Sequence, residues 1–152
     1  MTYPLCAFEI AYELGSLKLT VDKLYENKIA QKVGIGREFA GHMDLTVGRL
    51  TIEEAVLDAC VSSLIRFREE LGRLLRGSLK SASYQSYYDE RLSLRVSVDE
   101  EGNEWLTGRF VVVWNEGNVL TFSQKLPAGT AETVFAALTD CLTAMEVDLE
   151  EA

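Results

Sequence analysis

A period of two in the apolar residues is the feature that most limits how this chain can fold. Every second residue from 92 to 98 is apolar, and the same alternation returns from Leu106 through Phe110 to Trp114. Successive side chains of a β-strand point to opposite faces of a sheet, so each run predicts a strand with one buried face. Two such runs joined by a short polar segment predict a hairpin.

The N-terminal part of the chain has the same period. Phe8 to Leu14 alternate, Gly15-Ser16 is predicted as the turn, and residues 17–21 return as the second strand. The run from Phe39 to Val47 alternates as well and is expected to lead into a helix. Further strands are predicted at residues 29–33, 82–88 and 120–122.

Two segments follow a helical period instead. Thr51 and Glu54 have the spacing of a capping box, which predicts that the first helix begins at residue 51. Gly77 is expected to end it. The second helix is predicted to begin near Thr130, just after Pro127. The predicted buried stripe of the first helix is Val56, Cys60, Leu64, Phe67, Leu71, Leu74 and Leu75, and that of the second is Val134, Phe135, Leu138, Leu142, Met145 and Leu149.

These elements predict an α+β fold in one domain, residues 1–152. The expected architecture is an antiparallel sheet of about six to eight strands, built from hairpins and a meander. It is packed with two helices, one after the N-terminal strands and one at the C-terminus. Adjacent strands without helices between them argue against a parallel sheet.

Charge and cysteine content limit the kinds of partner. The chain has 24 acidic and 15 basic residues, a net charge of −9. Such a surface repels phosphate backbones, so nucleic-acid binding is not expected, whereas a basic protein would be attracted. The three separated cysteines suit reduced thiols. No secretory signal and no apolar run of about 20 residues is recognised, so we expect a cytoplasmic protein that does not span a membrane.

The residues predict no reaction, cofactor or metal site. His42 is the only histidine, which excludes a metal site built from several imidazoles, and its phase in the strand places it opposite Met43 and Leu45. We interpret it as a surface histidine. Paired carboxylates that act in acid–base catalysis need environments that separate their pKa values, usually through burial. The main cluster of carboxylates instead lies in a predicted polar turn.

That turn is the candidate partner-binding site. Asp99, Glu100, Glu101 and Glu104 surround Gly102-Asn103, and Trp105 follows directly. Their spacing does not match an EF-hand loop. Trp105 is out of phase with Leu106 and is expected on the opposite face of the sheet.

A second aromatic and acidic cluster follows the first predicted helix. Tyr87 is expected to point outward beside Asp89 and Glu90. Exposed aromatic residues flanked by acids are typical of protein interfaces, although packing at an edge strand explains them too.

The order of these segments resembles the WapI-like group of bacterial immunity proteins and related uncharacterised small domains. The resemblance extends from residue 45 to residue 145 and rests on "LIRFREELGRLLRGSLKSA", "RLSLRVSVDEEGNEWLTGRF", "LTFSQKL" and "VFAALTDCLTAM". The shared positions are Phe67, Leu71, Gly77, Gly102 and Gly108.

The resemblance implies a non-catalytic protein that binds and neutralises a cognate bacterial toxin domain. An acidic surface would steer association with a basic toxin. Two other classes stay open. A secretion chaperone or adaptor would hold an extended client segment, and an enzyme or small-ligand binder would need a pocket between sheet and helices. The oligomeric state, monomer or homodimer, is left open.

Overall fold

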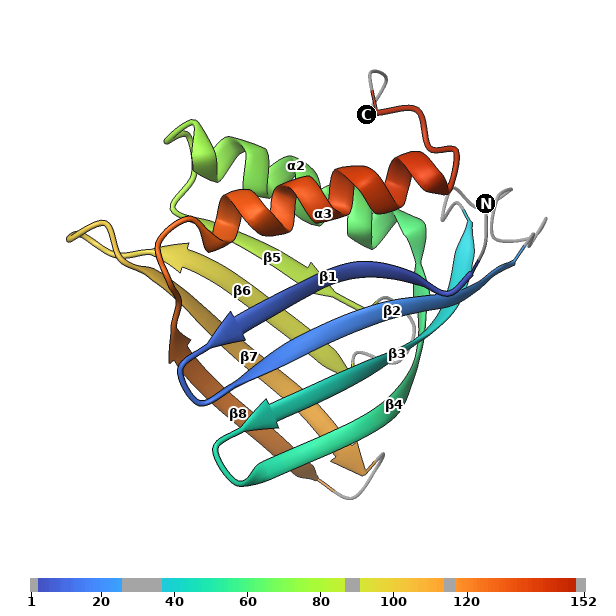
Figure 1. Ribbon diagram of the computed structural model, residues 1–152, viewed down its shortest axis with the longest axis horizontal. Helices are drawn as coiled ribbons and strands as arrows, with labels where there is room; N and C mark the ends of the chain where they lie inside the picture. The colour runs from blue at the N-terminus through green and yellow to red at the C-terminus, as the bar shows by residue number, and fades with distance from the viewer. Residues whose placement is uncertain (1–2, 26–36, 87–90, 114–116, 150–152) are drawn as a thin grey trace.

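The eight strands divide into two four-stranded antiparallel sheets, each followed by one helix (Figure 1). The computed structural model describes residues 3–25, 37–86, 91–113 and 117–149. The first sheet, sheet A, has the strand order β1-β2-β3-β4, and the second, sheet B, has the order β5-β6-β7-β8. The predicted α+β class, with antiparallel strands and helices in these two positions, is confirmed.

The elements have the following bounds. Sheet A consists of β1 (Leu5–Tyr12), β2 (Gly15–Tyr25), β3 (Glu38–Val47) and β4 (Leu50–Cys60), and it is followed by α2 (Val61–Leu75). Sheet B consists of β5 (Ser81–Gln85), β6 (Leu92–Val98), β7 (Glu104–Val113) and β8 (Asn118–Lys125), and it is followed by α3 (Thr130–Ala144).

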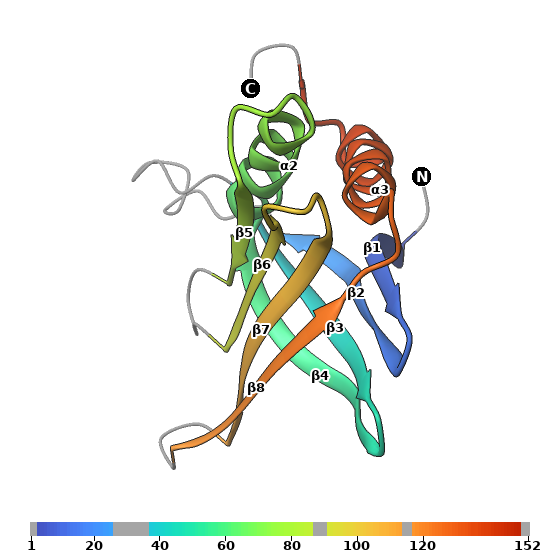
Figure 2. The same cartoon turned by 90° about the vertical axis from the view of Figure 1, so that its left-hand side faces the viewer.

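Each helix packs mainly on the first strand of the sheet that it does not follow in the chain. α2 follows β4 but lies along β5, whereas α3 follows β8 but lies along β1 (Figure 2). The two helices also contact each other. They therefore cover one edge of each sheet, and β4 and β8 form the opposite edges, away from the helices (Figures 1 and 2).

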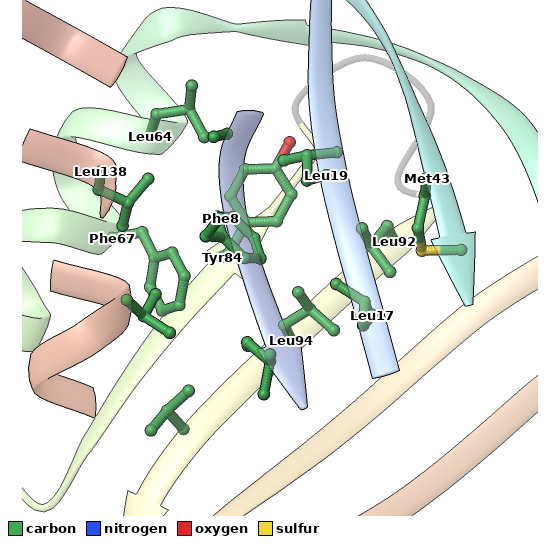
Figure 3. Packing of buried hydrophobic residues seen from close by; sticks show 14 of the residues in the cluster. Phe8, Leu17, Leu19, Met43, Leu64, Phe67, Tyr84, Leu92, Leu94 and Leu138 are labelled. Atoms are coloured by element: carbon green, nitrogen blue, oxygen red, sulfur yellow. The ribbon is translucent and has the colours of Figure 1, made fainter. Parts of the chain in front are cut away.

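The core is centred on three aromatic rings from β1, α2 and β5. The ring centroid of Phe8 lies 5.5 Å from that of Phe67 and 6.2 Å from that of Tyr84, and the Phe67 and Tyr84 centroids are 6.1 Å apart. Such edge-to-face contacts add to the free energy of burying the rings themselves. Leucines of both sheets and both helices surround the cluster (Figure 3). The core therefore joins the two halves of the chain.

The predicted start of the first helix is wrong. Residues 50–60 form β4, and α2 begins at Val61 without a side-chain cap. The spacing of Thr51 and Glu54 favours a helix locally, but residues 50–60 pair with β3 instead. Without this pairing, the backbone amides and carbonyls along the outer edge of β3 would lose their hydrogen-bond partners. Val56 is 63% exposed and belongs to no helical stripe.

A bulge in β4 explains why the predicted capping residue is not helical. The register slips between Met43 and Leu45, and Glu54 takes a positive φ of 50° there. Its amide donates to Asp44 Oδ1 at 2.9 Å.

The predicted end of the helix is confirmed. Gly77 has a φ of 80°, which disfavours any residue with a Cβ atom. Its amide donates to the Leu74 carbonyl, and the Ser78 amide donates to the Arg73 carbonyl. This pair of bonds is the Schellman motif that commonly ends helices.

The first hairpin also differs from the prediction. Glu13 and Leu14 form its turn, whereas Gly15 and Ser16 already belong to β2, so Leu14 is 58% exposed instead of buried. Gly15 is needed because a Cβ atom there would lie 2.0 Å from the Thr46 carbonyl oxygen on β3. The predicted strand at residues 29–33 and the position of Trp114 lie outside the described residues.

Replacing Phe67 by alanine is expected to lower the free energy of unfolding by about 3–5 kcal/mol. The substitution removes a buried ring and leaves a new cavity where β1, α2 and β5 meet. Urea unfolding measures this loss. Leu75→Ala on the same helix is the matched control, because Leu75 is 46% exposed, and its cost is expected to stay within about 0.5 kcal/mol. Equal losses in the two variants would contradict the central role of the aromatic cluster.

Candidate functional site

The predicted hairpin tip exists, and its first acid holds the turn together. Residues 99–103 connect β6 to β7. Asp99 Oδ1 accepts hydrogen bonds from the amides of Glu101 and Asn103, both at 2.9 Å. Gly102 has a φ of 83°, which suits a glycine at this position of a tight turn. Much of the hydrogen-bonding capacity of Asp99 is thus used within the hairpin.

Trp105 is bound to the same carboxylate. Its indole Nε1–H donates to Asp99 Oδ2 at 2.9 Å. This hydrogen bond, followed by the one from the Asn103 amide, lowers the pKa of Asp99 below its ordinary value of 3.8. Trp105 lies opposite Ser97 and Lys125 on the outer face of sheet B, whereas Leu106 is buried. The predicted opposite placement of these two residues is confirmed.

Glu104 binds the first turn of α3. Its Oε2 accepts from the Gly129 amide and its Oε1 from the Ala131 amide, both at 2.7 Å. The N-cap of α3 is Gly129, not the predicted Thr130, and a glycine has no side chain to satisfy these amides. A carboxylate at this end also complements the helix dipole.

The predicted partner-binding residues therefore separate into groups. The carboxylates of Asp99 and Glu104 accept hydrogen bonds from other residues of this chain. Trp105 is half-buried and donates to Asp99. Glu100 and Glu101 are exposed. The other predicted cluster, Tyr87, Asp89 and Glu90, lies outside the described residues.

A larger group of carboxylates lies on the outer face of sheet A. The registers of β1 to β4 place the outward side chains of all four strands next to one another. We call their carboxylates the acidic face, and its members are Glu9, Asp22, Glu38, Asp44 and Asp58. Two lysines, Lys18 and Lys23, share this surface. Lys18 lies directly opposite Glu9 on one side and Asp44 on the other.

His42 lies in the middle of the acidic face. Its Nδ1–H donates to Asp22 Oδ2 at 2.7 Å, and its Nε2 lies 3.7 Å from Asp44 Oδ2. The predicted outward phase of His42 is confirmed, since Met43 and Leu45 are buried.

A hollow of about 390 Å³ lies at one end of the acidic face. Its polar walls are Tyr25, Glu38 and Asp58, and Phe39 and Ala59 complete it. Two carboxylates beside a phenol ring suit a guanidinium or ammonium group, and Lys23 Nζ of this chain already lies 5.2 Å from the centroid of the Tyr25 ring. Sequence reasoning missed this surface because its acids are far apart along the chain. The local signal was a single acid between two buried neighbours, as with Glu9, Asp44 and Asp58. β2 lacks it because Asp22 is followed by exposed Lys23.

The part of the chain that the structure describes contains neither a cluster of metal ligands nor a helix that could span a membrane. Among residues 3–25, 37–86, 91–113 and 117–149, no group of three His, Cys, Asp or Glu side chains could hold a metal ion. No helix in the same ranges has the length and apolarity needed to cross a bilayer. Cys60 and Cys141 are buried, Cys6 is exposed, and none of the three forms a disulfide with another described residue. Burial raises the pKa of the Cys141 thiol to about 11.

Comparison with known proteins gives no match: neither a protein-family model nor a curated protein corresponds to this sequence.

Glu104→Gln is expected to lower the free energy of unfolding by about 1–2 kcal/mol, because α3 loses the charged acceptor at its first turn. Thermal and urea unfolding at neutral pH measure the loss. Glu100→Gln is the matched control, since it removes one carboxylate charge from the same hairpin at an exposed position. If both variants unfold like the parent protein, Glu104 does not stabilise α3.

The indole N–H resonance of Trp105 is expected to titrate with Asp99 at a pH below 3.8. Because the folded pKa is lowered, Asp99 contributes stability above the unfolded pKa, and this contribution is lost as the pH falls through the folded pKa. Asp99→Asn should abolish the titration and weaken the acid dependence of unfolding. A midpoint above 3.8 in the parent protein would contradict the assignment.

Proposed function

We propose that this chain is an immunity protein that binds and neutralises a cognate toxin domain without catalysis, and that the acidic face is the contact surface. The observation that carries the proposal is the grouping of five carboxylates on the outer face of sheet A, two of which, Asp22 and Asp44, flank His42. The resemblance to WapI-like immunity proteins led to the same class from the order of helices and strands.

Charge explains how such a surface would recognise its partner. An acidic patch on a protein of net charge −9 attracts a basic domain before contact and disfavours acidic competitors. The sheet fixes the backbone positions of its carboxylates, so little backbone entropy is lost on binding. The hollow between Glu38 and Asp58 offers a place for one lysine or arginine side chain of the partner.

The hairpin tip offers a second, smaller contact of the same sign. Glu100 and Glu101 are exposed there, and Trp105 presents part of its ring. The acidic face and the hairpin belong to different sheets, so variants can separate their contributions.

A secretion chaperone or adaptor is the second candidate, and the edge strand β4 favours it. β4 ends sheet A on the side away from the helices and exposes Leu50 and Val56. An extended client segment could pair with such an edge by β-augmentation. A client held in this way need not be toxic.

Co-expression with the product of the adjacent gene tests the immunity function directly. We expect that product to arrest growth when expressed alone, and co-expression of this chain to restore growth. The purified pair should form a complex whose association slows with salt. A non-toxic product that still binds would support the chaperone function, and the absence of both toxicity and binding would overturn the immunity proposal.

Three double variants, each of which removes two negative charges, locate the contact surface. Glu9→Gln with Asp58→Asn changes the acidic face, Glu100→Gln with Glu101→Gln changes the hairpin, and Glu69→Gln with Asp140→Asn changes the helices as a control. We expect association with the adjacent gene product to slow by roughly 3–10-fold for the first pair, by less for the hairpin pair, and not measurably for the helix pair, because local steering comes mainly from the acidic face. Stopped-flow fluorescence measures the rates. Slowing confined to the hairpin pair would assign the contact to the hairpin, and equal rates in all three would exclude both surfaces.

A further inference from the structure

The outer face of sheet B has the opposite charge to the acidic face. Its described outward side chains carry Arg95, Arg109 and Lys125 and no carboxylate. The remaining outward side chains are small or neutral: Ser81, Ser83, Gln85, Ser93, Ser97, Trp105, Thr107, Val111, Val119, Thr121 and Ser123. A cationic surface on a chain of net charge −9 is not explained by overall composition.

Arg95 and Arg109 are diagonal neighbours on the adjacent strands β6 and β7. Arg95 pairs across the strands with Thr107, and Arg109 lies two residues further along β7. Diagonal neighbours of this kind are about 7–8 Å apart between their Cα atoms, so both guanidinium groups can reach one point between them. Within the described part of the chain, neither arginine forms an ion pair with a carboxylate.

Hydroxyl groups flank both arginines in the sheet. Ser83 and Thr107 lie opposite Arg95, and Ser93 and Thr121 lie opposite Arg109. On sheet A the corresponding cation, Lys18, has a carboxylate opposite it on both sides. Placing two like charges side by side does not stabilise a sheet. The Glu70 carboxylate lies close to this edge, where it accepts from the Ser83 amide at 3.4 Å, but its ion pair is with Arg66. The arrangement is therefore better explained by a ligand than by folding.

The same residues surround a hollow of about 440 Å³. Its floor is the backbone of β5, β6 and β7 around Tyr84, Leu94 and Gly108, and Thr121 extends it to β8. Short serine and threonine side chains between two long arginines leave this floor open. The volume is within the range of small-molecule sites, which is roughly 300–1,000 Å³.

We propose that this hollow, the arginine hollow, binds a phosphate-bearing small molecule of about the size of a sugar phosphate. The planar guanidinium groups of Arg95 and Arg109 would bind the phosphate oxygens in bidentate fashion. The hydroxyl groups of Ser83, Ser93 and Thr107 and the amide of Gln85 would bind the polar remainder of the ligand.

A small anion suits the arginine hollow better than a polyanion does. Fields are screened beyond about 8–10 Å at physiological ionic strength, so a small ligand in the hollow experiences mainly the two arginines. A nucleic acid would extend over the rest of a surface with a net negative charge, which opposes its binding. This inference does not depend on the proposed immunity function, because it concerns the other sheet.

Titration with glucose 6-phosphate, inorganic phosphate and glucose, followed by amide NMR shifts, tests the proposal. We expect the first two probes to shift residues of β5 to β8 around Arg95 and Arg109, with glucose 6-phosphate binding tighter and glucose alone causing no shift. A dissociation constant on the order of 1 mM or tighter is expected for glucose 6-phosphate. Arg95→Gln and Arg109→Gln should each weaken it by about tenfold or more, because each loses charged hydrogen bonds to phosphate.

Lys18→Gln is the matched control, since it removes one exposed cation from the other sheet. It should leave the affinity unchanged, and unfolding curves should be alike for all three variants because the changed side chains are exposed. An equal loss of affinity in Lys18→Gln would mean that only net charge matters and would overturn the proposal. Absence of shifts on sheet B, or shifts that depend on protein concentration and so report a second copy, would overturn it as well.

Discussion

The contact of Phe8, Phe67 and Tyr84 is the interaction on which the rest of the structure depends. These rings come from the first strand of sheet A, from the helix that follows sheet A, and from the first strand of sheet B. Because α2 packs on β5 and α3 packs on β1, each half of the chain buries its sheet with the helix of the other half. The cluster therefore sets how the two sheets face each other, and with it which faces remain outside.

Two outer faces of opposite charge follow from this packing. Each strand alternates, so burying one face of each sheet leaves the intervening residues exposed together. On sheet A these include Glu9, Asp44 and Asp58, and on sheet B they include Arg95 and Arg109. The net charge of −9 is a sum over the whole chain, so it does not show that one sheet face is acidic and the other basic. Binding partners would meet one face or the other.

Local patterns predicted a large part of the fold. The hairpin of β6 and β7, the outward phase of His42 and the stop of α2 at Gly77 all follow from neighbouring residues. The start of α2 was mispredicted because the capping-box spacing of Thr51 and Glu54 is a local signal, and pairing with β3 outweighs it. The candidate site was predicted less completely. In the sequence, Glu104 is one of four similar carboxylates around a predicted turn. Only the tertiary structure brings the amides of Gly129 and Ala131 to it, so that it binds the start of α3.

The sequence by itself determined which residues of β6 and β7 are buried and where α2 ends, because alternation and a glycine at a positive φ act over a few residues. The tertiary structure decided how the strands divide into two sheets, which acids are used within the fold and where the charges gather. These outcomes depend on the register between strands and on contacts across tens of residues. Lys18 illustrates the difference: only the pairing of β1, β2 and β3 places it between Glu9 and Asp44, while Arg95 and Arg109 share a face without any acid.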